Sequence, residues 1–352
     1  MVNRDNFRKI DPYVPGDQPD FADMVKLNTK ENPYPPAPAV IEAAKRFSAG
    51  RLKLYPPTDG GALRRELAAY HKVAPESVFV GVGSDDVLSV IFQSCFNSGR
   101  KLFFPEISYS FYEVWAELYK IPYFKVPLKA DFTIDADDYI GRENGGIVIA
   151  NPNAPTSMAM SAADIERIVA ANPENIVVID EAYVDFGGES VLELTKKYDN
   201  LIVVRTFSKS RSMAGLRIGY AIAQTELISA INDVKNSINS YTMNFPSIEV
   251  GKASIAEEEY FRATISRILK TRERLVNELT DLGFVTFPSS ANFIFTTHKT
   301  VPAKEIFEKL REKHIFVRFF NKPLINNYLR ITVGTDEEVD KLIAGLKDIL
   351  NK

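Results

Sequence analysis

Several polar side chains follow runs of apolar residues that are typical of buried strands. Asp180 closes one such run, and Lys209 comes shortly after the run Leu201–Val204. A glycine turn at Gly83 follows a third run, Val78–Val82. In open α/β sheets, ligands bind beyond the carboxyl ends of the strands, so we expect these side chains to share one site.

A lysine, an aspartate and a phosphate-binding turn together favour pyridoxal phosphate as the cofactor of this site. Burial lowers the pKa of a lysine and makes it a nucleophile, so Lys209 could hold the cofactor's aldehyde as an imine. Asp180 would keep the pyridine nitrogen protonated, which lets the ring accept electrons. Backbone amides at a helix start after Gly83 favour phosphate, and Arg217 could add a permanent positive charge. Tyr109 stands where an aromatic ring could stack on the cofactor.

Each of these residues also has an ordinary explanation when it is taken alone. The turn at Gly83 can be a simple strand–helix connection, Asp180 a capping or metal-binding acid, and Lys209 a surface-loop lysine. Tyr109 can equally be a core aromatic, since the chain has 15 tyrosines. The pattern Gly81-x-Gly83 lacks the third glycine of a dinucleotide fingerprint, which disfavours an NAD-linked oxidoreductase. The combination, and not any single residue, carries the pyridoxal phosphate interpretation.

The composition narrows the class of protein. The 352 residues include 43 basic and 46 acidic side chains, a formal charge of −3 that gives no support for a nucleic-acid or anionic-membrane surface. The single Cys95 cannot form an internal disulfide, and three separated histidines, His71, His298 and His314, disfavour a metal centre. No apolar run approaches the length of a membrane span, and the polar start lacks the apolar core of a signal peptide. We therefore expect a cytoplasmic enzyme with no metal, nucleic-acid or membrane partner.

The elements that must position these residues are strands alternating with helices from about residue 78 to 223. Continuous Val and Ile runs at 147–150, 176–180 and 201–204 predict strands buried on both faces. Their alternation with helical segments predicts a mainly parallel sheet covered by helices. The segment 216–222 follows too closely for a crossover helix, so we expect it to pair antiparallel.

A second, smaller α+β unit is expected in the C-terminal part. An amphipathic helical stretch from about 247 to 279 precedes short strand-like runs and two further helical segments, at 303–313 and 336–349. The predicted fold class is therefore α/β, a mainly parallel mixed sheet flanked by helices plus a smaller α+β domain. The predicted division is an N-terminal segment packing with the small domain, 1–30, a large cofactor-binding domain, 31–245, and a small C-terminal domain, 246–352.

Five motifs share their order and spacing with a known enzyme family. They are Lys26–Tyr34, Asp180–Tyr183, Thr206–Lys209, Ala214–Arg217 and Leu329–Thr335. Through them the sequence resembles the fold-type I pyridoxal-phosphate aminotransferases, and within these the histidinol-phosphate aminotransferase group. The resemblance covers nearly the whole chain.

This resemblance implies a role for each residue of the cofactor site. Lys209 would form the aldimine with pyridoxal 5′-phosphate, Asp180 would contact the pyridine nitrogen, and Tyr183 would donate to the ring's phenolic oxygen. Lys209, Asp180 and Tyr183 are thus the expected catalytic residues. The remaining residues expected around the cofactor's phosphate and ring are Ser84, Asp85, Tyr109, Ser208 and Arg217.

The resemblance also implies a substrate site and a homodimer. Arg330 would bind the carboxylate of glutamate or 2-oxoglutarate, and Arg318 and Tyr13 would help to hold the phosphate of histidinol phosphate. For Arg318, a solvated charge at a strand edge is the plainer explanation. Tyr55 would reach into the neighbouring subunit's site, so the active site would require a second copy of the chain.

The implied reaction is a two-stage transamination. Glutamate displaces Lys209 from the cofactor, and the freed amine then moves a proton as general base and acid. In the second stage, imidazole acetol phosphate is converted to histidinol phosphate by the same steps in reverse order. A threonine-phosphate decarboxylase-like enzyme, a broad aromatic amino-acid aminotransferase and a non-catalytic ligand-binding relative are the alternatives.

One motif departs from the family pattern. Ala154 stands where the family has an asparagine that donates to the phenolic oxygen, and Ser157 replaces a glycine. Lys30 also stands where an asparagine is common. We expect Asn153 to take over the lost contact together with Tyr183, because a loop adjusts at little cost.

Overall fold

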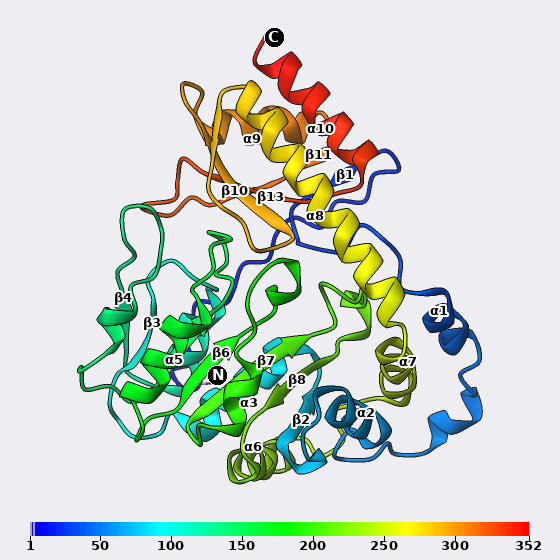
Figure 1. Ribbon diagram of the computed structural model, residues 1–352, viewed down its shortest axis with the longest axis vertical. Coiled ribbons are helices and arrows are strands. Elements are labelled where there is room, and N and C mark those ends of the chain that lie inside the picture. The colour runs from blue at the N-terminus through cyan, green and yellow to red at the C-terminus, as the bar shows by residue number, and fades with distance from the viewer. Residues whose placement is uncertain (1, 3, 352) are drawn as a thin grey trace.

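A computed structural model describes residues 2 and 4–351 of the chain. Its largest element is a seven-stranded sheet, seen in the lower half of Figure 1. β8 is antiparallel to both of its neighbours, whereas the other pairs are parallel, so the predicted mixed, mainly parallel sheet is confirmed. In sheet order the strands are β2 (Val78–Gly81), β8 (Gly219–Ile222), β7 (Leu201–Thr206), β6 (Val177–Asp180), β5 (Ile147–Ala150), β3 (Leu102–Pro105) and β4 (Tyr123–Val126).

The central strands are apolar throughout because helices cover both faces of the sheet. Side chains alternate between two cores, so Val178 faces one and Ile179 the other. One core is completed by α3 (Gly83–Cys95), α4 (Phe111–Tyr119) and α6 (Thr225–Ile238). The other is completed by α2 (Gly61–His71), α5 (Ala162–Ala171) and α7 (Phe245–Ile255).

A smaller antiparallel sheet lies above the large one in Figure 1. A separate hydrophobic core joins it to helices at the C-terminal end of the chain. Its strands, in order, are β12 (Arg318–Phe319), β13 (Leu329–Thr332), β10 (Phe293–His298) and β9 (Phe284–Thr286). The helices are α8 (Glu258–Asp281), α9 (Ala303–Glu312) and α10 (Asp336–Ile349).

The beginning of the chain pairs with its C-terminal part. β1 (Val25–Lys26) lies parallel to β11 (Ile315–Phe316), and the chain then runs on to α1 (Pro38–Lys45). α7 packs against α1 and against α2, beside the large sheet. The division into 1–30, 31–245 and 246–352 stays a prediction, although nearly all of α7 falls within 246–352 by number and packs beside the large sheet.

Three local features differ from the sequence-based expectation. The amphipathic stretch 247–279 forms two helices, α7 and α8, with a break at 256–257. β4 was not predicted, and the helical segment expected between the runs 176–180 and 201–204 is a short 3₁₀ helix. The short 3₁₀ helices are Arg4–Asn6, Ala49–Lys53, Pro75–Ser77, Ala136–Tyr139, Val184–Phe186, Leu192–Lys196 and Ala214–Leu216. Within the described residues, no helix is long and apolar enough to cross a membrane.

Candidate active site

The carboxyl ends of β5 and β6 meet the loop after β7 at a cavity that we call the inner cavity. The residues that line it include every predicted cofactor residue except Asn153. They are Lys30, Ser84, Asp85, Tyr109, Ala150, Ala154, Asp180, Ala182, Tyr183, Ser208, Lys209, Ala214 and Arg217.

Asp180 is the buried carboxylate of this cavity. The hydroxyl of Tyr112 donates to its Oδ2 at 2.9 Å, and the N–H of Ala182 donates to its Oδ1 at 3.1 Å. Burial is the strongest influence on this carboxyl and raises its pKa to about 6. A cationic N–H beside Asp180 would favour its charged form, which is what a protonated pyridine nitrogen supplies.

Lys209 provides an amine on the same cavity wall. Burial lowers the pKa of Lys209 to about 8, so a fraction of the amine is neutral and nucleophilic near neutral pH. Asn32 fixes the loop that carries it, since its Nδ2 donates to the carbonyls of Lys209 and Ser210, each at 3.1 Å. The loop therefore holds a reactive amine near the buried carboxylate.

The start of α3 and the loop before β8 form a cradle of hydrogen-bond donors. Arg217 lies 3.2 Å from Asp85 and 3.5 Å from the hydroxyl of Ser208. Gly83 has a φ of 83°, in the left-handed region that favours glycine, and a Cβ on it would lie 2.5 Å from the Arg217 guanidinium. Amides at a helix start, a hydroxyl and a guanidinium are the donors that a phosphate group needs.

Two tyrosines complete the wall of the inner cavity. The hydroxyl of Tyr109 donates to Asp85 at 2.7 Å, which fixes the ring beside the cradle. Burial raises the pKa of Tyr109 and of Tyr183 above the ordinary range, so both hydroxyls stay protonated and can donate. Tyr183 packs edge-on against Phe293 of the smaller unit, with ring centroids 5.0 Å apart.

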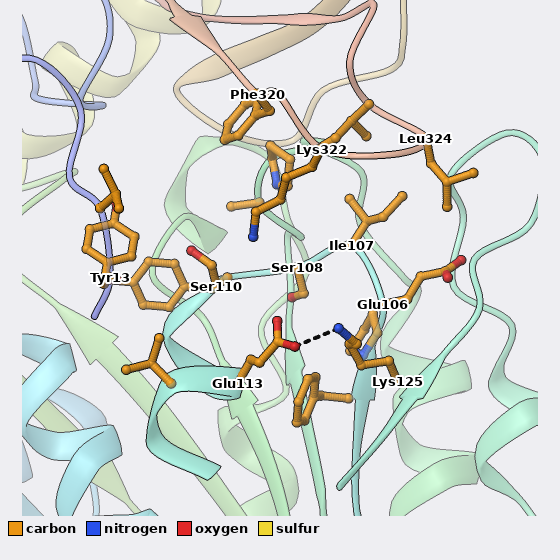
Figure 2. A pocket seen from close by; sticks show the side chains of 18 of the residues that line it. Tyr13, Glu106, Ile107, Ser108, Ser110, Glu113, Lys125, Phe320, Lys322 and Leu324 are labelled. Atoms are coloured by element: carbon orange, nitrogen blue, oxygen red, sulfur yellow. Dashed lines mark hydrogen bonds and ion pairs between the residues drawn. The ribbon is translucent and has the colours of Figure 1, made fainter. Parts of the chain in front are cut away.

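A wider cavity of about 620 Å³, the outer cavity, opens from the inner one. Figure 2 shows its walls: Tyr13 comes from the N-terminal segment, and Phe320 and Lys322 come from the C-terminal part. The two cavities share Lys30, Tyr109 and Ala154. A substrate in the outer cavity would therefore border a cofactor in the inner one.

Arg330 is a buried guanidinium in the wall of the outer cavity. Its Nη2 donates to the carbonyl of Asn28 at 2.7 Å, whereas its buried Nε has no partner among the described residues. Burial lowers the pKa of Arg330 to about 10, a cost that a bound carboxylate would offset. Arg318 also lines this cavity, but its Nη atoms donate to the carbonyls of Val14 and Pro15.

Comparisons with known proteins agree with this chemistry. The family described as Aminotransferase class I and II matches residues 22–346 of the chain. The chain belongs to this family. The predicted resemblance to aminotransferases is thereby confirmed, and the protein is a pyridoxal-phosphate-dependent transaminase.

Individual relatives lie in one group of the family. The chain is 50% identical over 352 residues to the histidinol-phosphate aminotransferase of Lactococcus lactis subsp. lactis (strain IL1403), covering 100% of this chain and 98% of that protein. It is 49% identical over 347 residues to that of Acinetobacter baumannii (strain AB307-0294), covering 97% and 96%. The histidinol-phosphate aminotransferase of Sinorhizobium meliloti, solved with pyridoxal-5′-phosphate, is 25% identical, with a TM-score of 0.85 over 92% of this chain and 90% of that one.

The charges that line the aminotransferase's inner cavity fit an anionic cofactor. Lys30, Lys209 and Arg217 face two carboxylates, Asp85 and Asp180, and Arg217 already pairs with Asp85. The excess positive charge suits the phosphate and the phenolate of pyridoxal phosphate. In the described part of the chain, no cluster of three or more His, Cys, Asp or Glu side chains could hold a metal ion.

Asn153 is held by polar contacts outside the inner cavity. Its Nδ2 donates to the carbonyl of Ile107 at 2.9 Å and to the hydroxyl of Thr156 at 3.0 Å. Its Oδ1 accepts from Ser108 at 2.8 Å. One amide hydrogen is used by the loop after β3 and the other by Thr156, and Asn153 does not line the inner cavity, so the structure gives no support to its predicted contact with the phenolic oxygen.

Tyr55 lies away from both cavities of its own chain. Its side chain is 79% exposed and stacks on Tyr241 at a centroid distance of 4.5 Å. Leu52, Leu54 and Ile238 are exposed large apolar side chains close to these two tyrosines in the sequence.

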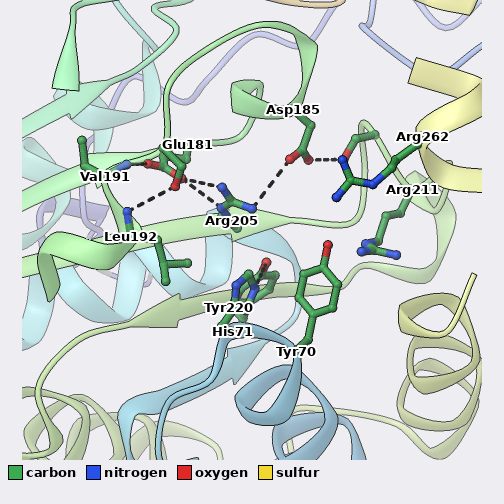
Figure 3. Close-up of polar contacts among 12 residues, drawn as sticks. Tyr70, His71, Glu181, Asp185, Val191, Leu192, Arg205, Arg211, Tyr220 and Arg262 are labelled. Carbon is green, nitrogen blue, oxygen red and sulfur yellow. Dashed lines mark hydrogen bonds and ion pairs between the residues drawn. The ribbon is translucent and has the colours of Figure 1, made fainter. Parts of the chain in front are cut away.

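A buried ion pair behind Asp180 was not predicted. The Oε2 of Glu181 accepts from Nε of Arg205 at 2.9 Å, and its Oε1 accepts from the N–H of Val191 at 2.6 Å (Figure 3). Arg205 also lies 3.6 Å from Asp185. Because Glu181 follows Asp180 directly and Arg205 lies in β7, the pair fixes β6 to β7 at the end that carries the site.

Proposed function

We propose that this transaminase moves an amino group between glutamate and imidazole acetol phosphate, giving 2-oxoglutarate and histidinol phosphate for histidine biosynthesis. The observation that carries the chemistry is one cavity that unites the Lys209 amine, with a pKa of about 8, and the buried carboxyl of Asp180, with a pKa of about 6. The choice of substrate is supported by whole-chain identity of about half to histidinol-phosphate aminotransferases.

The residues of the inner cavity would hold pyridoxal 5′-phosphate, linked covalently through the amine of Lys209. When bound, this cofactor supplies an electron sink for the charge that develops at the substrate's Cα. Asp180 would hold the proton on the pyridine nitrogen, and Tyr183 would donate to the phenolic oxygen. Arg217 and Ser208, with the first amides of α3, would bind the phosphate.

Lys209 would also move the proton of the reaction. Once the substrate's amino group takes its place, the amine is free to take a proton from Cα as general base and to return it as general acid. A pKa near neutrality suits both tasks, because neither protonation state is then rare. The loop bonds from Asn32 keep the amine in position throughout.

Arg330 would orient the substrate by its carboxylate. Its guanidinium lines the outer cavity, and the planar N–H donors of this group match a carboxylate's two oxygens. Tyr13, Arg318 and Lys322 line the same outer cavity, where a phosphate group at the far end of the substrate would be placed.

We further propose a homodimer in which Tyr55 completes the partner subunit's site. Its exposure of 79%, together with the neighbouring exposed apolar side chains, suits a surface that a second copy covers. The test is complementation between two variants that are inactive alone, Tyr55→Ala and Lys209→Ala. Mixed and exchanged subunits should regain activity if Tyr55 acts across the interface. The cytoplasmic location stays a prediction.

A half-reaction screen tests the substrate assignment. The holoenzyme is mixed separately with glutamate, histidinol phosphate, phenylalanine, tyrosine and threonine phosphate, and the visible band of the bound cofactor is followed. Glutamate and histidinol phosphate should bleach the band fastest. Rapid bleaching by phenylalanine with none by histidinol phosphate would contradict the assignment, and release of carbon dioxide from threonine phosphate would identify a decarboxylase instead.

A further inference from the structure

A second buried lysine lies where the two cavities meet. Lys30 lines both the inner and the outer cavity and is only 8% exposed. Its Nζ lies 5.7 Å from the ring centroid of Tyr109 and 5.3 Å from that of Tyr183. No hydrogen bond or ion pair of this ammonium occurs among the described residues, so it is available to a ligand bound in either cavity.

The main chain at Lys30 is held in a conformation that lysine does not favour. Its φ of 63° lies in the left-handed region, which glycine, asparagine and aspartate adopt far more readily. The N–H donates to the hydroxyl of Thr332 at 3.1 Å, and the carbonyl accepts from Asn292 at 3.0 Å. The backbone therefore gives no reason for a lysine at this position, whereas a cavity that requires an ammonium does.

Among the described residues, the positive charge of Lys30 has no carboxylate of its own, because the nearby carboxylates already have other partners. After burial, Arg330 and Lys209 are the next influences that lower its pKa, while Asp85 and Asp180 raise it. Asp85 is already bonded to Arg217 and Tyr109, and Asp180 to Tyr112 and the Ala182 amide. An anionic ligand would supply the missing negative charge and stabilise the charged form of Lys30.

The residues beside Lys30 show which hydrogen-bond donors a ligand would meet on this side of the inner cavity. Ala154, which lines both cavities with Lys30, presents a methyl group that cannot donate a hydrogen bond. The side-chain amide of the adjacent Asn153 already donates to Thr156 and to the carbonyl of Ile107. Tyr183 and Lys30 are therefore the donors available on this side of the inner cavity.

We propose that Lys30 is a positioning residue whose ammonium donates to the phenolate oxygen of the bound cofactor, beside the hydroxyl of Tyr183. The inference rests on the proposed cofactor chemistry at Lys209 and adds a donor that none of the predicted site residues supplies. A positive charge at this place disfavours a second positive charge on the nearby linkage to Lys209. Lys30 would thus help the linkage to lose its proton at a lower pH.

The test is a pH titration of the visible band of the holoenzyme without substrate. In Lys30→Met, the pH at which the protonated band is half lost should rise by about one unit, a tenfold change in proton affinity. Lys30→Arg should stay close to the wild type, because it keeps the charge. Lys322→Met is the matched control, since Lys322 lines only the outer cavity and its loss should leave the titration unchanged.

A second readout covers the case in which Lys30→Met holds the cofactor poorly. The dissociation constant for pyridoxal phosphate, measured by fluorescence with the apoenzyme, should rise about tenfold in Lys30→Met but not in Lys322→Met. A wild-type titration and dissociation constant in Lys30→Met would overturn the proposal. If only the KM for glutamate then rises, the ammonium binds the substrate's carboxylate beside Arg330. A wild-type enzyme that shows no visible band would instead contradict the proposed function itself.

Discussion

The hydroxyl of Tyr112 in α4 donates a hydrogen bond of 2.9 Å to the carboxylate of Asp180 at the end of β6. The side chain of Tyr112 is fully buried, so water does not compete for this bond. No lysine or arginine of the described chain forms an ion pair with Asp180. The carboxylate is therefore oriented by neutral donors, and its counter-charge is left for a ligand to supply.

We expect Tyr112→Phe to weaken cofactor binding. The bond from Tyr112 lowers the pKa of Asp180, so its loss makes the carboxylate easier to protonate and less able to hold the pyridine N–H. A hydrogen bond to a charged group is worth about 1.5–3 kcal/mol, which corresponds to a dissociation constant roughly 10- to 150-fold higher. Fluorescence titration of the apoenzyme with pyridoxal phosphate measures this dissociation constant.

Tyr139→Phe is the matched control for this prediction. It removes the same atom from a buried tyrosine whose hydroxyl has no partner among the described residues. Its dissociation constant should equal that of the wild type. Equal values in the Tyr112 and Tyr139 variants would show that the bond to Asp180 has no part in binding.

The capture of the cofactor should depend on pH through the amine of Lys209. Burial lowers its pKa to about 8, and only the neutral amine attacks the aldehyde. The neutral fraction increases with pH, so the rate at which the apoenzyme gains the visible band should increase through about pH 8 and then level off. Stopped-flow absorbance measures this rate.

Lys209→Ala should give no visible band at any pH while keeping the circular dichroism of the folded protein. It should also lack transamination. A rate that increases only near the ordinary lysine pKa of about 10.4 would show that burial does not activate this amine.

Arg330→Ala should impair glutamate and 2-oxoglutarate much more than the cofactor. A charge-assisted pair with a carboxylate is worth on the order of 2–3 kcal/mol, so the KM for glutamate should rise roughly 30- to 150-fold. Arg318→Ala is the comparison variant, and its KM for glutamate should rise less. Both of its Nη atoms already donate to carbonyls of the N-terminal segment. An unchanged glutamate half-reaction in Arg330→Ala would assign the guanidinium a purely structural role.

Glu181→Gln should destabilise the fold. Glu181 is 1% exposed in its side chain and pairs with Arg205 at 2.9 Å. Loss of its charge leaves Arg205 only the more distant Asp185, at 3.6 Å, so the cost should be at most about 3–5 kcal/mol, that of a broken buried pair. Urea denaturation of the holoenzyme measures the decrease in the free energy of unfolding. Glu193→Gln removes a 74% exposed partner of Lys196 and should leave the midpoint unchanged. Equal midpoints in the two variants would contradict this account.

The fold was predictable where burial dictates the residue type. β5, β6 and β7 are continuous Val and Ile runs because helices cover both of their faces. The break between α7 and α8 is not marked by a glycine or proline at residues 256–257, and the local signal for it is the acidic run Glu257–Glu259, which suits the first turn of a helix. The packing of α7 against α1 and α2 is a tertiary feature that local sequence does not contain.

In the candidate site, too, the sequence predicted the residues at strand ends but not the contacts that depend on tertiary packing. Strand ends predicted Asp180 and Lys209, because the parallel strands place both at one edge of the sheet. The direction of Asn153 depends on bonds to Thr156 and to Ile107 in another loop, and the contact of Tyr112 with Asp180 depends on how α4 packs on the sheet. The replacement of asparagine by Lys30 was visible in the sequence, but its position between two cavities was not.

The parallel pairing of Val25 with Ile315 also sets the order in which the molecule can assemble. This contact has a very large separation along the chain, so its closure entropy is high and it forms late. On the ribosome, the large sheet can collapse while the last hundred or so residues are still being made. The bond from Arg330 to the carbonyl of Asn28 depends on the same pairing, so in a nascent protein this wall of the outer cavity would be completed after the large sheet.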